Sequence, residues 1–144
     1  EHAGEFVHGY SYSGHPLACA AGMVNLLILQ EEQIVERVRD VTSPYLKPLR
    51  EGLADHELVG EARMTGLVGA LELVADKTTM ARFPKEIGAG TQCRDMSVAN
   101  GLVMRAVGDS MIISPPLIIS EEECDVLLAR ARTTLDELAA ALHT

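Results

Sequence analysis

The chain has 144 residues, enough for a domain with a hydrophobic core, and 47% of them are hydrophobic. Its 21 acidic residues outnumber its 12 basic ones, and the formal net charge is -9. This balance argues against a nucleic-acid partner, because phosphates demand a basic surface. The longest apolar stretch, residues 17–29, is too short to span a bilayer, and the chain opens without a signal peptide. We therefore expect no membrane partner.

Three widely spaced cysteines, Cys19, Cys93 and Cys124, predict neither a disulfide framework nor a metal site. Each falls in an apolar helical pattern, where a buried and inert thiol is usual. A reducing, cytoplasmic location fits this usage. The chain starts in mid-pattern without Met, so we interpret it as a fragment or a processed product.

A polar, hydroxyl-rich loop occupies residues 8–16, with the sequence HGYSYSGHP from His8 to Pro16. Gly9 and Gly14 allow the backbone to turn where a side chain would clash, and Pro16 suits the first position of a helix. Such a loop before a helix N-terminus is suited to hold an anion such as phosphate. The alternative is an ordinary loop with a good helix start.

The apolar spacing after this loop predicts a helix over residues 16–31. It is apolar on most faces, so we expect it to be largely buried. A second helical pattern covers residues 32–53, and Pro44 and Pro48 interrupt it. Either the prolines kink one helix or Ser43 caps a new one. The polar face of this pattern carries Glu36, Arg37, Arg39, Lys47 and Arg50.

Two short strands are predicted next, at residues 59–62 and 66–74, after a turn at residues 55–60. Residues 76–85 form an exposed loop, and a helix follows from Pro84–Glu86 to about Asn100.

Two further strands are predicted at residues 102–106 and 111–114, separated by a Gly108–Asp109 turn. Ser120 and Glu123 have the spacing of a capping box, which starts a helix that runs to about Leu142. The order of the elements indicates an α/β or α+β-like small domain, in which long helices pack on a small, largely antiparallel sheet.

Three blocks of the chain resemble one family. His8 to Cys19, HGYSYSGHPLAC, is similar to the signature that class III pyridoxal-phosphate aminotransferases carry after their cofactor lysine. Residues 101–109, GLVMRAVGD, and 113–117, ISPPL, resemble the carboxy-terminal segment of that family. Residues 65–77, TGLVGALELVADK, resemble its Gly-hydrophobic-Glu strand. The resemblance is greatest to the branch that moves amino groups between amines or omega-amino acids and pyruvate.

The resemblance implies the C-terminal part of a fold-type I transferase that depends on pyridoxal 5'-phosphate (PLP). Residues 1–30 would be the end of the large domain, with the phosphate-contact loop and a linking helix, and residues 31–144 the small C-terminal domain. The lysine that holds the cofactor and the acid beside the pyridine nitrogen are expected upstream. We therefore expect no catalytic residue in this chain, and no transamination by these 144 residues alone. A homodimer or a dimer of dimers is implied, with small amines and keto acids as substrates.

Two loop residues are the cofactor-binding candidates that the resemblance implies. The hydroxyl residue at the position of Ser11 reaches the cofactor phosphate of the neighbouring subunit in the family, which more often has Thr there. Tyr10 sits where the family makes a backbone or aromatic contact to the same phosphate. The alternative is that both are plain loop residues. His15 is expected to orient or cap the loop rather than to catalyse.

Arg105 is the substrate-binding candidate. It is predicted at the end of a short strand before a glycine turn, and its planar fork suits a carboxylate. The resemblance implies that it binds the carboxylate of the keto-acid or amino-acid substrate and swings away for amines that have none. A structural salt bridge is the alternative. We expect Glu72 and Asp76 to be solvated without a partner, and Met104 and Met111 to be core.

Two other functions stay open at this point. The chain could be a stand-alone interaction or dimerisation domain derived from such an enzyme, or part of a decarboxylase or aminomutase of the same fold. The amine donor is not indicated by these residues.

Overall fold

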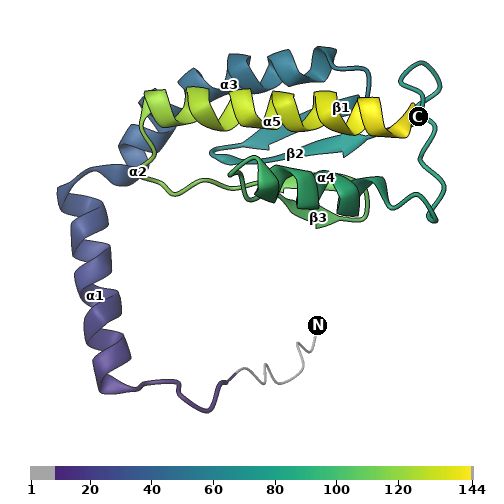
Figure 1. Cartoon of the computed structure of the whole chain (residues 1–144). Coiled ribbons are helices and arrows are strands. Elements are labelled where there is room, and N and C mark those ends of the chain that lie inside the picture. The colour runs from purple at the N-terminus through teal and green to yellow at the C-terminus, as the bar shows by residue number, and fades with distance from the viewer. Residues whose placement is uncertain (1–8, 144) are drawn as a thin grey trace, which may run out of the picture. The chain divides into compact units, whose positions relative to one another are not determined.

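The chain forms two compact units, residues 1–34 and residues 35–144. The computed structural model describes residues 9–143, so His8, the first residue of the predicted phosphate loop, lies outside the described residues. Figure 1 shows the elements of the chain in order.

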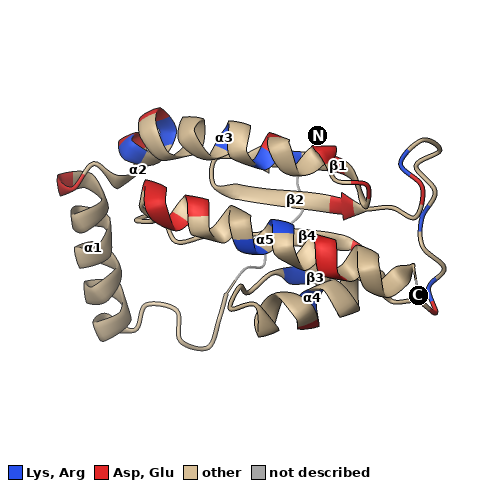
Figure 2. Ribbon diagram, turned by 45° about the horizontal axis from the view of Figure 1, so that its top comes forward, with Lys and Arg blue, Asp and Glu red and all other residues tan. Residues whose placement is uncertain are grey.

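Among the described residues 9–33 of the first unit, the regular element is helix α1 (Pro16–Glu31). Pro16 takes the first helical position, as predicted. Figure 2 shows no charged residue along α1 before Glu31 at its end. None of its residues is buried, so the prediction of a largely buried helix is wrong for this chain. The reason is that residues 9–33, the described part of this unit, contain no second element against which the apolar faces of α1 could pack.

A nearly continuous helical segment follows, and a π-helical turn interrupts it. Its parts are α2 (Ile34–Arg37), the π-helix η1 (Val38–Thr42), α3 (Ser43–Glu51) and the 3-10 helix η2 (Gly52–Asp55). The amide of Ser43 donates to the carbonyl of Val38, five residues back instead of the usual four. This shift in the helical hydrogen bonds comes just before Pro44, which has no amide to donate. The hydroxyl of Ser43 donates to the carbonyl of Gly66 at 3.1 Å. The alternative in which Ser43 caps a new helix is therefore wrong.

The sheet has four strands in the order β1-β2-β4-β3, and every pairing is antiparallel, as predicted. The strands are β1 (Val59–Thr65), β2 (Val68–Leu73), β3 (Arg105–Val107) and β4 (Ser110–Ile113). The first strand extends three residues beyond its predicted end because the turn lies at Gly66, whose φ is +57°. The predicted Gly108 turn joins β3 to β4.

Helices α3, α4 (Ala89–Ala99) and α5 (Glu121–Leu142) pack on one face of this sheet (Figure 1). Along the strands, residues on the helix-covered face alternate with half-exposed or exposed ones. The other face is covered by no helix of this unit among the described residues. It is therefore the face that can present side chains outward.

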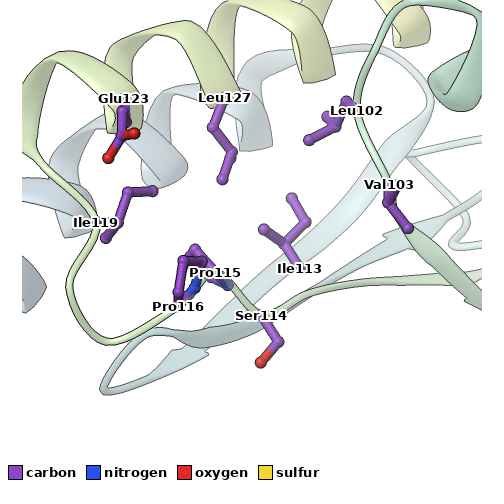
Figure 3. Close-up of a pocket in the computed structure, with 9 residues that line it drawn as sticks. All are labelled: Leu102, Val103, Ile113, Ser114, Pro115, Pro116, Ile119, Glu123 and Leu127. Atoms are coloured by element: carbon purple, nitrogen blue, oxygen red, sulfur yellow. The ribbon is translucent and has the colours of Figure 1, made fainter.

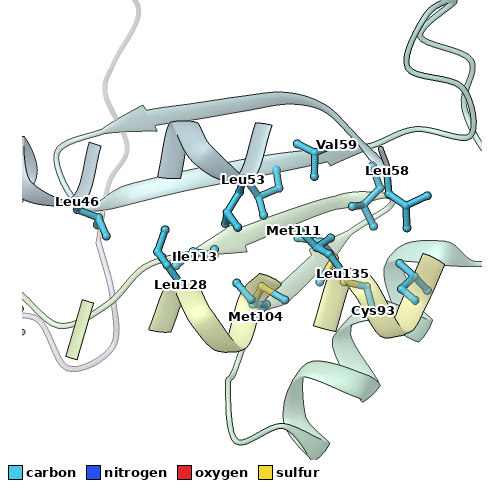
Figure 4. Packing of buried hydrophobic residues seen from close by; sticks show 14 of the residues in the cluster. Leu46, Leu53, Leu58, Val59, Cys93, Met104, Met111, Ile113, Leu128 and Leu135 are labelled. Atoms are coloured by element: carbon cyan, nitrogen blue, oxygen red, sulfur yellow. The ribbon is translucent and has the colours of Figure 1, made fainter. Parts of the chain in front are cut away.

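The core of the second unit lies between the sheet and α5 (Figure 4). Leu71 and Met111 come from the central strands, and Leu135 and Leu138 come from α5. Met104 and Met111 are core residues, as predicted.

The three cysteines differ in burial: Cys93 and Cys124 are buried, whereas Cys19 on α1 is exposed, contrary to expectation. Burial raises the pKa of the Cys93 thiol to about 12, which keeps it protonated and inert.

Helix α4 starts at Ala89, several residues later than predicted, because the chain first makes a left-handed turn at Gly88. The carboxylate of Asp109 accepts a hydrogen bond from the amide of Gly90 at 2.9 Å and so caps the helix from the β3–β4 turn. A side chain at residue 90 would meet the carbonyl of Gly108 at 2.0 Å. The glycine lets the helix and the turn approach this closely.

Along residues 9–143, no helix combines the length and the apolar character that a membrane span requires. The same residues contain no group of three or more His, Cys, Asp or Glu side chains that could hold a metal ion.

Candidate functional site

The predicted phosphate loop is a hydrogen-bonded turn directly before α1. The amide of Ser13 donates to the carbonyl of Tyr10 at 2.9 Å, and the amide of Tyr10 donates to the hydroxyl of Ser13 at 3.1 Å. These two bonds fix the backbone on either side of Ser11. The Ser11 side chain is exposed and makes no hydrogen bond to a described residue. Its hydroxyl can therefore serve a ligand.

The donors of this turn suit an oxyanion. Gly14 takes a left-handed φ of +77°, and α1 begins without a side-chain cap from His15. Because no side chain caps it, the amides that follow Pro16 in the first turn of α1 remain available to a ligand. The residues present thus fit the phosphate of PLP, and the turn offers nothing for the reactive end of that cofactor.

The three lysines of the chain all lie in the second unit. Lys47 pairs with Glu51 at 3.8 Å. Lys77 donates to the carbonyls of Ala54 and His56 and holds the loop before β1.

Arg105 opens the edge strand β3, where it is paired through the backbone with Ile112 of β4. Its side chain is exposed and forms no hydrogen bond or ion pair with a described residue. The register continues from Ile112 to Ala70 and from Ala70 to Arg63, so Arg105 and Arg63 end one row of the uncovered sheet face. A guanidinium with a free fork can take a carboxylate through two parallel hydrogen bonds.

A cluster of charges that the sequence reasoning missed lies on the same face. Arg63 donates to Glu61 at 3.0 Å and to Glu72 at 3.2 Å, and the hydroxyl of Ser110 also donates to Glu72. Glu61 and Glu72 are paired across β1 and β2, so Arg63 offsets the repulsion between two like charges. The expectation that Glu72 has no partner is wrong. The alternation of Glu61 and Arg63 along β1 was the signal that could have shown it.

The charge cluster borders a cavity of about 790 Å³ beside the segment after β2. The cavity wall also includes Arg82, Lys85 and Asp109. Asp76, which starts this segment, accepts hydrogen bonds from the amides of Thr78 and Thr79. The side chain of Thr79 and these two amides hold the pKa of the Asp76 carboxyl below the ordinary value. Asp76 therefore organises the loop and is not a solvated carboxylate without a partner.

A second, apolar cavity of about 350 Å³ lies between α5 and the Pro115–Pro116 segment (Figure 3). Leu127 borders it from α5, and Ile119 borders it from the loop before that helix. Glu123, one of its few polar residues, already accepts a hydrogen bond from the amide of Ser120. This cavity can take an apolar group, and its side chains offer no acid–base chemistry.

The predicted site residues are divided between the two units. Tyr10 and Ser11 belong to the first unit, and Arg105 belongs to the second. Each presents an exposed side chain. The cofactor contacts of Tyr10 and Ser11 and the substrate contact of Arg105 stay predictions.

Comparisons with known protein families and with individual proteins point to the same family. The class-III aminotransferase family matches residues 1–135. The putrescine–pyruvate aminotransferase of Pseudomonas aeruginosa is 54% identical over 139 residues, which cover 96% of this chain and 30% of that protein. The mitochondrial gamma aminobutyrate transaminase 1 of Solanum lycopersicum is 36% identical over 125 residues, with 87% and 24% covered.

Solved structures agree with this result. A thermostable (S)-enantioselective omega-transaminase from Thermomicrobium roseum superposes with a TM-score of 0.83 at 36% identity, covering 93% of this chain and 30% of that one. The chain thus spans less than a third of these relatives. Its fold is that of the corresponding part of fold-type I transaminases. With the family matched over nearly its whole length, this chain belongs to the class-III aminotransferases.

Proposed function

We propose that the protein is a PLP-dependent transaminase that moves an amino group from an amine or an omega-amino acid to pyruvate, and that these residues are its C-terminal part. The likeness to the putrescine–pyruvate aminotransferase supports the pyruvate acceptor. The decarboxylase and aminomutase alternatives gain no support from the relatives, whose names are those of transaminases.

The observation that carries the proposal is the free guanidinium of Arg105 on the uncovered face of the sheet. A keto acid such as pyruvate offers a planar carboxylate, and the fork of Arg105 matches it. Because the side chain has no partner among the described residues, it can turn toward a carboxylate and turn away from an amine that has none. One residue can thus serve both halves of a transamination.

The phosphate of the cofactor would be held at the turn before α1. There the hydroxyl of Ser11 donates to a phosphate oxygen, the first amides of α1 add donors, and Tyr10 contributes a contact beside it. When bound, PLP supplies the electron sink for the carbon that carries the amino group. The role of the chain is to bind and orient, and the reactive lysine is expected outside these residues.

A homodimer or a dimer of dimers in the cytoplasm is part of the proposal. The exposed apolar faces of α1 support an assembled state, because a helix with this composition is normally buried. Sedimentation of the active protein measures it, and a monomer at working concentration would contradict it.

Substitution of Arg105 tests the acceptor role in an active form of the protein that carries the family lysine. Arg105→Ala should lower kcat/KM for pyruvate by about 10- to 100-fold, since hydrogen bonds to a charged group contribute about 1.5–3 kcal/mol. An aldehyde acceptor has no carboxylate, so its kcat/KM should stay unchanged. Arg94→Ala is the matched control, because Arg94 is also exposed and pairs only with its neighbour Asp95. Equal pyruvate kinetics in the Arg105 variant and the control would disprove the role.

A further inference from the structure

The dipeptide Asn100–Gly101 ends α4, and the geometry of this helix end explains why a glycine follows the asparagine. The amide of Gly101 donates to the carbonyl of Val98 at 3.0 Å. The next amide, that of Leu102, donates to the carbonyl of Ser97 at 2.8 Å. This pair of bonds is a Schellman motif, which needs a left-handed residue directly after the cap. Gly101 meets the need with a φ of +72°.

The side chain of Asn100 joins α4 to the neighbouring helix α5 (Figure 1). Its Nδ2 atom donates to the hydroxyl of Thr134 at 3.1 Å and to the carboxylate of Glu137 at 2.7 Å. Thr134 is buried, whereas Glu137 is exposed. The guanidinium of Arg130 donates to the carbonyl of Gly101 at 2.6 Å. We call these three bonds from the dipeptide to α5 the Asn100 clamp.

An asparagine that precedes a glycine is open to attack by the backbone, because glycine has no side chain to obstruct the approach. In this reaction the Gly101 amide gives its proton to a base, and its nitrogen bonds to Cγ of Asn100. The bond from Cγ to Nδ2 breaks, ammonia leaves, and a cyclic imide remains. Water then opens the imide at either carbonyl and gives an aspartate or an isoaspartate. The sum is an amide and water converted to an acid and ammonia, without an oxidant or a cofactor.

The folded structure holds both reacting groups away from each other. The attacking nitrogen of Gly101 directs its proton to the carbonyl of Val98, and the leaving group Nδ2 is bonded to α5. Ring closure also requires rotation about ψ of Asn100, which is +7° and continues the helix. That rotation turns the Gly101 amide away from Val98. The Schellman bonds and the Asn100 clamp must therefore break before the imide can form.

We propose that Asn100–Gly101 is a site of spontaneous deamidation that reacts only when the contact between α4 and α5 opens. The folded chain protects the dipeptide, and each local or global opening exposes it. The product cannot restore the clamp, because an aspartate at residue 100 has no N–H to donate and places a second carboxylate beside Glu137. An isoaspartate also lengthens the main chain within the helix cap. One opening that ends in reaction thus loosens the α4–α5 contact permanently.

Incubation of the 144-residue chain in mildly alkaline buffer tests the site. One sample stays folded and a second is unfolded in guanidinium chloride, and mass spectrometry of the digested chain then measures conversion of Asn100 to aspartate and isoaspartate. Conversion in the folded sample should be slower by at least about tenfold, since only the opened fraction of molecules reacts. Asn25, the other asparagine of the chain, precedes Leu26 and should stay far behind Asn100 in the unfolded sample.

Substitutions separate the clamp from the dipeptide itself. Glu137→Ala removes the charged acceptor and should raise the rate in the folded sample by about three- to tenfold, because the lost bond favours opening. The rate in the unfolded sample should not change. Asp95→Ala is the matched control, since Asp95 is an exposed acid of α4 that pairs with its neighbour Arg94. Asn100→Asp imitates one product and should lower the urea midpoint of the folded chain.

Each outcome decides one part of the proposal. An unfolded chain that keeps Asn100 intact would overturn the site, and equal rates in the folded and unfolded samples would overturn the protection. Equal folded-state rates in Glu137→Ala and Asp95→Ala would show that the Asn100 clamp does not protect the dipeptide. Urea midpoints of both variants are measured in parallel. A faster reaction without a matching loss of global stability supports local opening, and a rate that only follows global stability contradicts it.

Discussion

Gly69 and Arg50 form a size-matched pair in the covered face of the sheet. A Cβ built at residue 69 would lie 1.5 Å from Nη1 of Arg50. The guanidinium therefore fills the space that any other residue at this position would need for its side chain. Glycine in a strand interior weakens the strand by itself, so its presence here indicates close packing rather than strand propensity. The pair also explains how a charged side chain can lie in the interior without displacing β2.

Gly69→Ala should therefore lower the free energy of unfolding by about 1–3 kcal/mol, the usual range for overpacking. Urea denaturation followed by circular dichroism measures it. Gly52→Ala is the matched control: residue 52 is helical and has no atom within 4 Å of an added Cβ, so the change should be neutral or slightly stabilising. The packing between Gly69 and Arg50 is refuted if both variants unfold at the same urea concentration.

At the residue scale, single side chains were predictable where their context is local. The exposed state of Arg105 follows from its place before a glycine turn, and Met104 and Met111 follow from their apolar neighbours. Arg50 was not predictable. Its position in the helical pattern predicts an exposed side chain on the polar face. Its burial depends on the space left by Gly69, which lies 19 residues later in the sequence.

The start of α5 is the best-defined helix terminus among the described elements. The hydroxyl of Ser120 accepts the amide of Glu123 at 3.1 Å, and the Glu123 carboxylate accepts the amide of Ser120 at 2.9 Å. This reciprocal pair is the predicted capping box. The capping box fixes the N-terminus of α5, the helix whose residues Leu135 and Leu138 lie in the core.

Ser120→Ala removes one half of that pair and should lower the free energy of unfolding by about 1 kcal/mol. Chemical denaturation measures the difference. Thr133→Ala on the same helix is the control, because the exposed Thr133 hydroxyl donates only to the carbonyl of Ala129 within the helix. It should stay within about 0.5 kcal/mol of the parent chain. A loss of the same size in both variants would show that the box adds no stability.

At the element scale, prediction succeeded where strong local signals mark both ends. The capping box and the long apolar repeat defined α5 to Leu142 as predicted. The segment around Pro44 was harder, since sequence periodicity does not distinguish a kink from a π-helical turn. The burial of α1 was mispredicted for a different reason: an apolar pattern shows what a helix could bury, but it does not show whether a neighbour is present.

His56 links the stability of the whole second unit to pH. The ring is 5% exposed, its Nδ1 accepts the amide of Leu58 at 3.1 Å, and Nε2 lies 3.2 Å from the carboxylate of Asp136. Burial lowers the pKa of His56 and Arg132 adds to this effect, whereas Asp136 and Glu57 oppose it. The folded protein therefore takes up the proton at a lower pH than the unfolded chain does.

The free energy of unfolding should fall as the pH drops below about 6.5, the ordinary pKa of histidine, toward the lowered pKa of the folded state. The sign follows because the unfolded chain binds more protons in that interval. Urea midpoints at several pH values between about 7.5 and 5 measure it. His56→Asn keeps an acceptor for the Leu58 amide and should flatten the dependence in this interval. Parallel curves for the two proteins would assign the pH dependence to other groups.

At the scale of the molecule, the sequence predicted the helix and sheet layers but not the side-chain pairs that form between neighbouring strands. Four strands and their antiparallel character followed from alternation and turn residues. The charge cluster of Arg63 and Glu72 was missed because pairing across β1 and β2 depends on register, which alternation alone does not give. The proposed phosphate and carboxylate contacts at Ser11 and Arg105 rest on resemblance, since neither side chain has a described partner that marks it.

The strand order has a consequence for how the chain is made. Strand β3 precedes β4 in the sequence, yet among the described strands it pairs only with β4, which in turn pairs with β2. During synthesis, β3 therefore waits without a hydrogen-bonding partner until Ser110–Ile113 has left the ribosome. The hairpin of β3 and β4 is then the piece that closes the sheet, and the long final helix can cover the core only after that closure.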